Sequence, residues 1–169
     1  MADFTFAHRE EGFDEHIEKS IRGYSQLMDD VISLSRHFVE KGTSVVDIGC
    51  STGKMTKALI DYNLDHIESG VEFIGIEIAD GFQKDLRKRE EEIKKYYSNV
   101  HFEQSDARYY DYKRKSFTTE DIMDKERTLR HMMKPNTWRE IEDMLMEVGF
   151  GVVQPFWRNH AFVGALAVK

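Results

Sequence analysis

Apolar residues in the first part of the chain recur at three- and four-residue steps. They are Phe13, Ile17, Ile21, Tyr24, Leu27, Met28, Val31, Leu34 and Phe38. Residues spaced in this way lie on one face of a helix, so the pattern predicts a long helix over residues 13–38. Glycine destabilises a helix interior, and Gly23 lies in the middle of this segment. We therefore expect the helix to be bent or interrupted near Gly23.

The pattern then changes to short apolar runs separated by longer segments of helical character. The runs predict strands at Ser44–Ile48, Glu72–Ile78 and Val100–Gln104, and the segments between them predict helices at Lys54–Tyr62 and Asp80–Tyr97. Strands that alternate with helices in this way are joined by right-handed crossovers and form a parallel sheet. The sequence thus predicts an α/β fold, with the long helix preceding the sheet.

The C-terminal third of the chain has a different pattern. It predicts a loop at Arg108–Thr118, helices at Thr119–Met133 and Thr137–Val148, and strands at Gly151–Phe156 and Ala161–Val168. Turn-forming residues separate the two strands, so they predict an antiparallel hairpin. The expected fold is a reduced Rossmann-like sheet of three parallel strands, followed by this hairpin.

Length and composition narrow the class of protein. A chain of 169 residues is expected to form one domain, residues 1–169. Its apolar runs are too short to span a bilayer, and residues 1–20 lack the pattern of a signal peptide. The single cysteine, Cys50, rules out an internal disulfide and fits a reducing cytoplasm. A net charge of −7 argues against a broad nucleic-acid-binding surface.

A glycine-containing loop follows the first predicted strand. The segment reads VVDIGCSTG and supplies Asp47, Gly49, Cys50, Ser51 and Gly53. In parallel sheets, ligands bind beyond the carboxyl ends of the strands, and glycines let the backbone approach them closely. The spacing lacks the third glycine of a dinucleotide fingerprint, and the lysine–serine pair of a phosphate loop is absent. Asp47 instead indicates a positively charged partner, such as an amino or sulfonium group.

Acidic residues also follow the second and third predicted strands. Glu77 lies 24 residues after Gly53, at a position where a carboxylate accepts hydrogen bonds from both ribose hydroxyls. Asp106 is placed to accept a hydrogen bond from an adenine amino group. An aspartate after a strand is by itself more often a turn former. Acids after three successive strands, however, predict a nucleoside site.

These segments resemble a known family. VVDIGCSTG, FIGIEIADGF and HFEQSDARYYD look like the first three motifs of class I S-adenosylmethionine-dependent methyltransferases. FDEHIEKSIRGYS and the C-terminal MLMEVGFGVVQPFWRNHAFVGALAVK are similar to carboxy-S-adenosylmethionine synthases. The resemblance implies that S-adenosylmethionine, or a carboxylated derivative of it, is the cofactor. It also implies that the residues lining the cofactor are Tyr24, Gly49, Cys50, Ser51, Glu77, Ile78, Asp106 and Ala107.

The chain departs from these synthases after its third strand. Only Arg108–Glu120 separate Asp106 from the segment that resembles the late helices of the family, whereas one strand–helix–strand crossover needs about 30 residues. We therefore expect the fourth and fifth strands to be missing. In the synthases, the arginine that holds the extra carboxylate belongs to a Lys-Arg pair. Here the sequence reads Lys125-Glu126-Arg127, and Arg127 and Arg130 are the candidate substitutes at a substrate site.

Three functions fit this sequence. The first is a methyltransferase, or a relative that modifies the cofactor, acting on an unidentified acceptor. The second is a non-catalytic protein that binds S-adenosylmethionine but has lost the substrate half, and the third is an interaction protein with a vestigial pocket. The sequence provides no base near Cys50 and no histidines at metal-ligand spacing, so we expect neither a cysteine nucleophile nor a metal site. A shortened sheet leaves an open edge, which predicts a homo-oligomer.

Overall fold

The computed structural model describes residues 12–67, 70–107, 110, 136–159 and 162–169. The chain divides into two compact units, Met1–Tyr109 and Tyr110–Lys169, each of which is described by itself. The predicted helix Thr119–Met133 lies outside the described residues, and so do Arg127 and Arg130.

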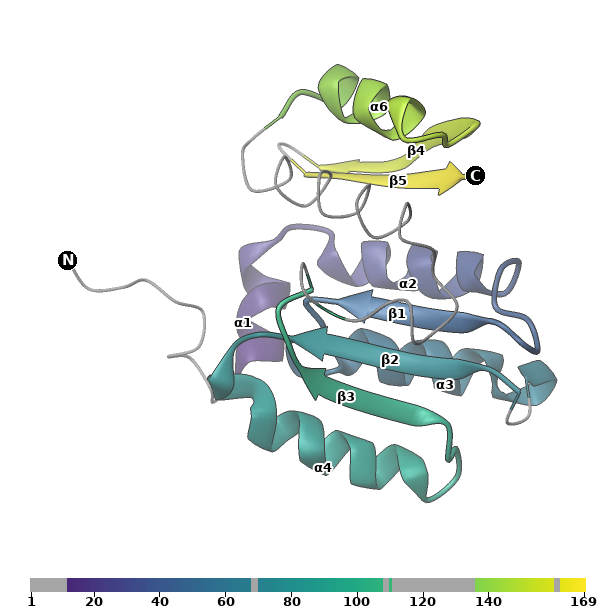
Figure 1. Cartoon of the computed structure of the whole chain (residues 1–169). Helices are drawn as coiled ribbons and strands as arrows, with labels where there is room; N and C mark the ends of the chain where they lie inside the picture. The colour runs from purple at the N-terminus through teal and green to yellow at the C-terminus, as the bar shows by residue number, and fades with distance from the viewer. Residues whose placement is uncertain (1–11, 68–69, 108–109, 111–135, 160–161) are drawn as a thin grey trace. The chain divides into compact units, whose positions relative to one another are not determined.

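Three parallel strands form the sheet of the first unit, in the order β1-β2-β3 (Figure 1). They are β1 (Ser44–Ile48), β2 (Glu72–Glu77) and β3 (Val100–Gln104). β2 is the central strand and is almost completely buried, because it pairs on both sides. The predicted strands and their parallel arrangement are confirmed.

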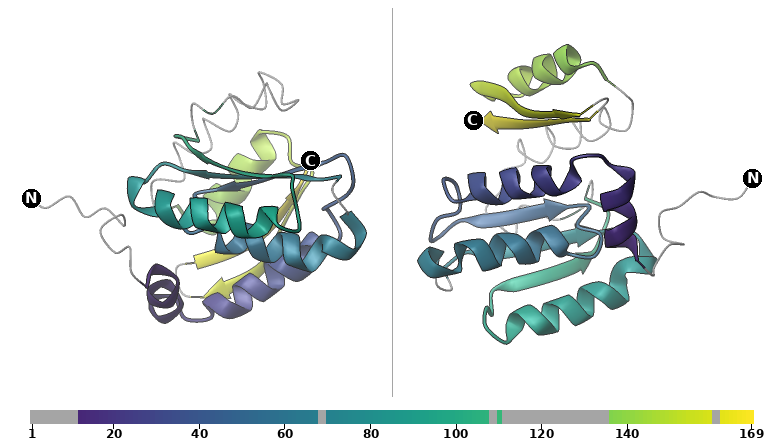
Figure 2. Two further views of the ribbon diagram at one scale, coloured as in Figure 1. Left: turned by 90° about the horizontal axis from the view of Figure 1, so that it is seen from below. Right: turned by 180° about the vertical axis from the view of Figure 1, so that it is seen from behind.

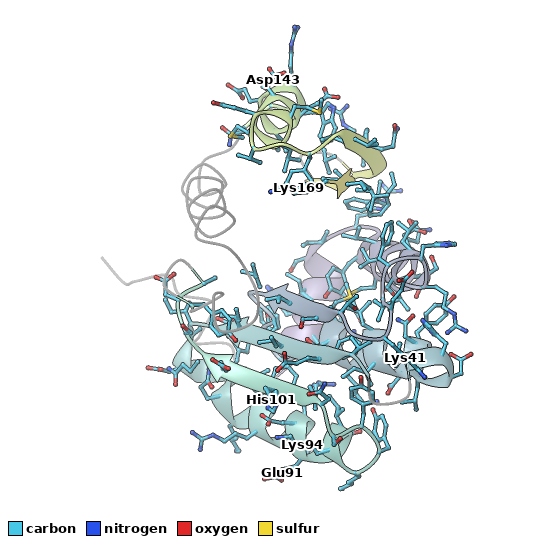
Figure 3. The ribbon with its side chains drawn as sticks, turned by 45° about the vertical axis from the view of Figure 1, so that its right-hand side comes forward. Lys41, Glu91, Lys94, His101, Asp143 and Lys169 are labelled. Carbon is cyan, nitrogen blue, oxygen red and sulfur yellow. The ribbon has the colours of Figure 1, made fainter. Side chains whose placement is uncertain are left out.

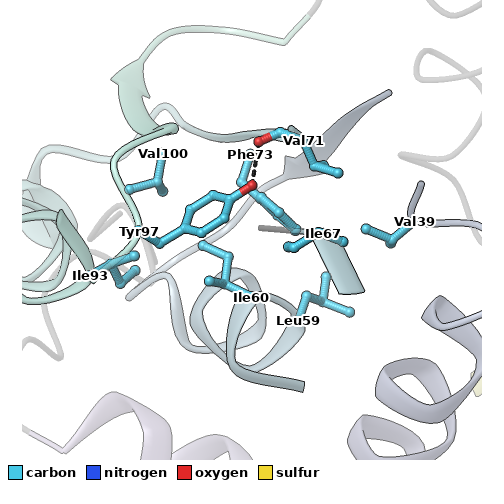
Figure 4. Packing of buried hydrophobic residues seen from close by; sticks show 9 residues of the cluster. All are labelled: Val39, Leu59, Ile60, Ile67, Val71, Phe73, Ile93, Tyr97 and Val100. Atoms are coloured by element: carbon cyan, nitrogen blue, oxygen red, sulfur yellow. Dashed lines mark hydrogen bonds between the residues drawn. The ribbon is translucent and has the colours of Figure 1, made fainter. Parts of the chain in front are cut away.

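The crossover helices are α3 (Lys54–Ile67) and α4 (Gln83–Lys94), and a short 3₁₀ turn, η2 (Asp80–Phe82), precedes α4. The main core lies between these helices and the sheet, and Figure 4 shows the residues that form it. These are Val39, Leu59, Ile60, Ile67, Val71, Phe73, Ile93, Tyr97 and Val100. The Tyr97 hydroxyl donates a hydrogen bond of 2.5 Å to the Val71 carbonyl, so the one polar atom of this ring is satisfied.

The predicted N-terminal helix forms as two helices, α1 (Phe13–Ser20) and α2 (Tyr24–Ser35). The interruption falls where it was predicted, because Gly23 adopts a φ of 79°, a conformation that favours glycine. The two helices are joined through this break in Figure 2. Charged side chains such as Lys41, Glu91 and Lys94 lie on the exposed surface of the unit (Figure 3).

The second unit contains α6 (Trp138–Glu147) and a hairpin of β4 (Val152–Asn159) and β5 (Phe162–Val168). Thr137 and Glu140 begin α6 with a capping box, in which each side chain bonds the backbone N–H of the other residue. β4 and β5 pair as antiparallel strands with an irregularity between Pro155 and Trp157. The predicted helix and hairpin are confirmed. Within the described ranges, no helix has the length and apolar character needed to cross a membrane.

Candidate cofactor site

The loop after β1 has three positions of positive φ, Gly49 at 74°, Ser51 at 51° and Gly53 at 72°. The Gly49 and Cys50 N–H groups both donate to the Ile76 carbonyl, at 2.8 and 3.2 Å, which holds the start of the loop against β2. A Cβ atom built on Gly49 would meet no atom within 4 Å. Gly49 therefore faces open space, as a position that admits a ligand should.

Gly53 has a different environment. A Cβ atom there would lie 2.7 Å from Cζ of Phe102, and one on Gly75 would lie 2.4 Å from Cδ1 of the same ring. Phe102 thus fills the space that both glycines leave. The packing of Phe102 and the positive φ of Gly53 both require glycine here, and the predicted contact of Gly53 with the cofactor stays a prediction. The sequence reasoning missed Phe102 because the ring comes from β3, far along the chain.

Asp47, near the end of β1, is a partly buried carboxylate. Burial raises its pKa, and the nearby Glu77 adds to this rise, whereas hydrogen bonds from Thr56 oppose it. The Thr56 hydroxyl donates to Oδ2 of Asp47 at 2.7 Å. No lysine, arginine or histidine of the described residues forms an ion pair with Asp47. A partly desolvated carboxylate without a cation suits a positively charged ligand group.

Glu77 ends β2 and is only 7% exposed. Its Oε2 accepts a hydrogen bond of 2.9 Å from the Ser51 N–H, and its Oε1 accepts one of 2.8 Å from the Ala79 N–H. The carboxylate therefore fastens the loop after β1 to the loop after β2. Each carboxylate oxygen has two acceptor positions, so a ribose hydroxyl on either oxygen is compatible with these bonds. The sequence predicted the ribose role of Glu77 and missed its contact with the loop.

The remaining predicted nucleoside contacts lie at the same edge of the sheet. Ile78 follows Glu77 directly and is 60% exposed, which places a large apolar side chain at the end of β2. The Ser105 N–H donates to the Glu77 carbonyl at 3.2 Å, which extends the pairing of β2 and β3 to the residue before Asp106. Asp106 and Ala107 are partly exposed. The structure thus groups the predicted ribose and adenine contacts.

Tyr24 begins α2 immediately after the break at Gly23. Burial raises the pKa of its phenol, Lys54 lowers it, and the carboxylates of Asp14, Glu18 and Asp47 raise it further. The Lys54 ammonium lies 5.9 Å from the centre of the ring. Tyr24 precedes the sheet in sequence, and its contact with the cofactor stays a prediction.

Helix α1 is attached to the glycine loop by contacts that the sequence did not predict. The Thr52 hydroxyl donates to Asp14 at 2.7 Å, and Arg89 Nε donates to the Thr52 carbonyl at 2.6 Å. Arg89 also lies 3.7 Å from Asp14, beside a pocket of about 260 Å³ between α1 and α4. The FDEH segment of α1 resembles the synthases, but no local pattern in it indicates these partners.

Cys50 is buried, and its burial together with the carboxylates of Asp47 and Glu77 raises the pKa of the thiol far above its ordinary value. The thiol form is therefore strongly favoured, and the thiolate is the nucleophilic form. Cys50 packs with Phe82 and Leu86 instead. Within the described part of the chain, no group of three or more histidine, cysteine or acidic side chains is arranged to hold a metal.

A three-stranded parallel sheet with a glycine loop and acidic residues at the carboxyl ends of its strands forms an α/β site of the kind that binds nucleosides. A family model described as "Methyltransferase domain" matches residues 39–165, and the chain belongs to this family.

A carboxy-S-adenosyl-L-methionine synthase from Staphylococcus epidermidis is 25% identical over 214 aligned positions, covering 93% of this chain and 92% of the relative. This alignment is longer than the 169-residue chain, so it contains gaps on this chain's side. Such gaps agree with the predicted loss of an internal segment.

Two solved structures share the fold. A methyltransferase dependent on S-adenosylmethionine (SAM) from Aquifex aeolicus aligns with a TM-score of 0.56 at 12% identity, over 89% of this chain and 93% of that one. Magnesium protoporphyrin IX methyltransferase from Synechocystis, with bound SAM, aligns with a TM-score of 0.53 at 14% identity, over 86% and 78%.

Proposed function

We propose that this protein binds S-adenosylmethionine at the carboxyl ends of β1, β2 and β3 and transfers a group from it to an acceptor. The observation that carries the proposal is the paired arrangement of Asp47 and Glu77. Asp47 has no cationic partner among the residues that the structure describes, and Glu77 bridges two loops with acceptor positions to spare. Membership of the methyltransferase family supports it, as does a structural neighbour that holds SAM.

The adenosine half of the ligand would lie over the ends of β2 and β3. Glu77 would accept hydrogen bonds from the ribose hydroxyls, and Asp106 one from the adenine amino group. Ile78, exposed beside Glu77, would pack against the adenine ring. Asp47 would face the positively charged end of the ligand, with Tyr24 close by.

Catalysis of group transfer from a sulfonium demands little chemistry from protein side chains. The sulfonium already activates the carbon that is transferred, so the protein contributes by binding, orienting and excluding water. A thiol held in its neutral form at Cys50 is consistent with such a mechanism. Arg127 and Arg130 are the sequence-based candidates for a substrate site.

A second candidate reaction changes the cofactor itself. The similarity to the S. epidermidis synthase over nearly the whole chain favours a relative that handles a carboxylated form of S-adenosylmethionine. A third alternative is a protein that binds the cofactor without catalysis. The gaps on this chain's side of the alignment favour it, because they leave less chain to form a substrate site.

Mass spectrometry of small molecules released from the purified protein distinguishes bound S-adenosylmethionine, its carboxylated form and an empty pocket. We expect S-adenosylmethionine, its demethylated product or its carboxylated form to be recovered in proportion to the protein. Calorimetric titration of ligand-free protein with S-adenosylhomocysteine provides the quantitative test. No recovered nucleoside, together with no heat of binding at millimolar ligand, would overturn the proposed function.

A further inference from the structure

Lys54 is a basic side chain within an otherwise acidic part of the site. It is the first residue of α3 and directly follows the glycine loop. Its ammonium pairs with Glu18 of α1 and lies 5.9 Å from the centre of the Tyr24 ring. The pKa of the Tyr24 phenol is raised by burial and by three carboxylates, including that of Asp47, and is lowered by Lys54. The Thr56 hydroxyl, two residues after Lys54 on α3, donates to Asp47 at 2.7 Å. The positive charge of Lys54 and the negative charge of Asp47 therefore both lie near the start of α3.

A ligand with an amino-acid tail has two charges to satisfy. Its ammonium group suits Asp47, which has no cationic partner among the described residues. Its carboxylate would be repelled by Asp47 and Glu77 unless a cation lies beside it. Lys54 supplies a cation, and the positive end of the α3 dipole adds favourable partial charge. The site thus has complementary charge for both ends of a zwitterion.

We propose that Lys54 binds the carboxylate of the ligand's amino-acid tail and leaves Glu18 when the ligand enters. The proposal rests on the proposed function and specifies which part of the ligand this residue recognises. The exchange is inexpensive because Lys54 and Glu18 are 34% and 41% exposed, and ion pairs at such exposure contribute little stability. The pair with Glu18 raises the pKa of Lys54, which stays protonated at neutral pH.

Two ligands that differ only in the tail isolate this contact. S-adenosylhomocysteine carries the amino-acid tail, whereas 5′-methylthioadenosine has the same nucleoside and thioether without it. Titration of Lys54→Gln should show an affinity for S-adenosylhomocysteine that is lower by about tenfold or more, the usual loss for a charged hydrogen bond. The affinity of the same variant for 5′-methylthioadenosine should change less than about twofold.

Glu18→Gln serves as the matched variant, because it breaks the same ion pair from the other side. If Lys54 acts on the ligand, Glu18→Gln leaves the affinity for S-adenosylhomocysteine unchanged or tighter. If Lys54 only fastens α1 to the loop, both variants lose affinity equally, which would overturn the proposal. Lys57→Gln controls for the loss of a positive charge on α3, because Lys57 pairs with Asp61 of the same helix.

The two proposals fail in different ways. Wild-type protein that binds neither ligand would overturn the proposed function and this inference with it. Wild-type protein that binds both ligands equally, or a Lys54→Gln variant that loses both equally, would overturn the inference and leave the nucleoside site standing.

Discussion

The two units of this chain differ in how much of their apolar surface is buried. The first unit has a central strand that is buried along nearly its whole length and a nine-residue core. In the second, α6 has no buried residue, and Met146, Val152 and Val168 are 49%, 54% and 40% exposed. A two-stranded hairpin is marginally stable alone. The predicted nucleoside contacts therefore lie on a unit with its own core, while the described part of the other has little.

The largest effect that follows from this difference is association. We expect the second unit to be stabilised by pairing with a second copy of the chain, with an association free energy of about 8 kcal/mol if the affinity is micromolar. Light scattering at micromolar concentration should give about twice the chain mass of 19.8 kDa. Val152→Lys with Val168→Lys should give a monomer, whereas Leu64→Lys on α3 should not. A wild-type mass near that of one chain would reject the dimer.

The next prediction compares the loss of stability when a glycine in each unit is replaced by alanine. Gly75→Ala places a Cβ atom against Phe102 in the interior of the first unit and should lower the free energy of unfolding by about 3 kcal/mol. Gly151→Ala in the second unit meets only the Val168 carbonyl, at 3.9 Å, so its change should stay within about 0.5 kcal/mol. Urea unfolding measures the change in the free energy of unfolding for both variants. Equal losses would show that the packing around Phe102 is looser than the structure indicates.

Glu77 tests the site itself. Glu77→Gln keeps the shape of the side chain but removes its charge and half of its acceptor capacity, so binding of S-adenosylhomocysteine should weaken by about 2 kcal/mol. Asp80→Asn is the matched control, because Asp80 is an exposed acid in the next turn that accepts a hydrogen bond from Gln104. Calorimetric titration of both variants with S-adenosylhomocysteine measures the two affinities. An affinity for Glu77→Gln equal to that of the wild type would mean that Glu77 does not hold the ribose.

Features set by neighbouring residues could be predicted from sequence. The break at Gly23, the three parallel strands and the C-terminal hairpin all follow from local periodicity and turn residues. The sequence predicts that the helix after the first strand ends at Tyr62, five residues before the observed end of α3 at Ile67. Asn63 is fully buried and donates hydrogen bonds to Ser35 and to the Leu59 carbonyl.

Contacts between distant segments could not be predicted. The position of Glu77 after a strand predicts a ligand contact, but its bond to Ser51 joins residues 26 positions apart. The need for glycine at positions 53 and 75 depends on Phe102 of another strand. Local patterns identify which residues end a strand, whereas packing decides which of them also hold the loop.

The smallest expected effect concerns Asp47, where binding and stability should change in opposite directions. Burial raises the pKa of this carboxyl in the folded protein, so its ionised form costs stability once the pH exceeds the ordinary aspartate range. Asp47→Asn removes that cost and can still accept the Thr56 hydrogen bond. The melting temperature of the ligand-free variant should therefore exceed that of wild type by a few degrees at pH 7. The difference should vanish at acidic pH, where Asp47 is protonated in both the folded and the unfolded protein.

The affinity for the ligand should change in the opposite direction, because the amide of Asp47→Asn offers no charge to a cationic ligand group. For the same reason, wild-type affinity should fall as Asp47 becomes protonated. A variant that melts below wild type at pH 7 would show that the ionised carboxylate is already compensated in the free protein, and the argument for a cationic ligand at Asp47 would fail.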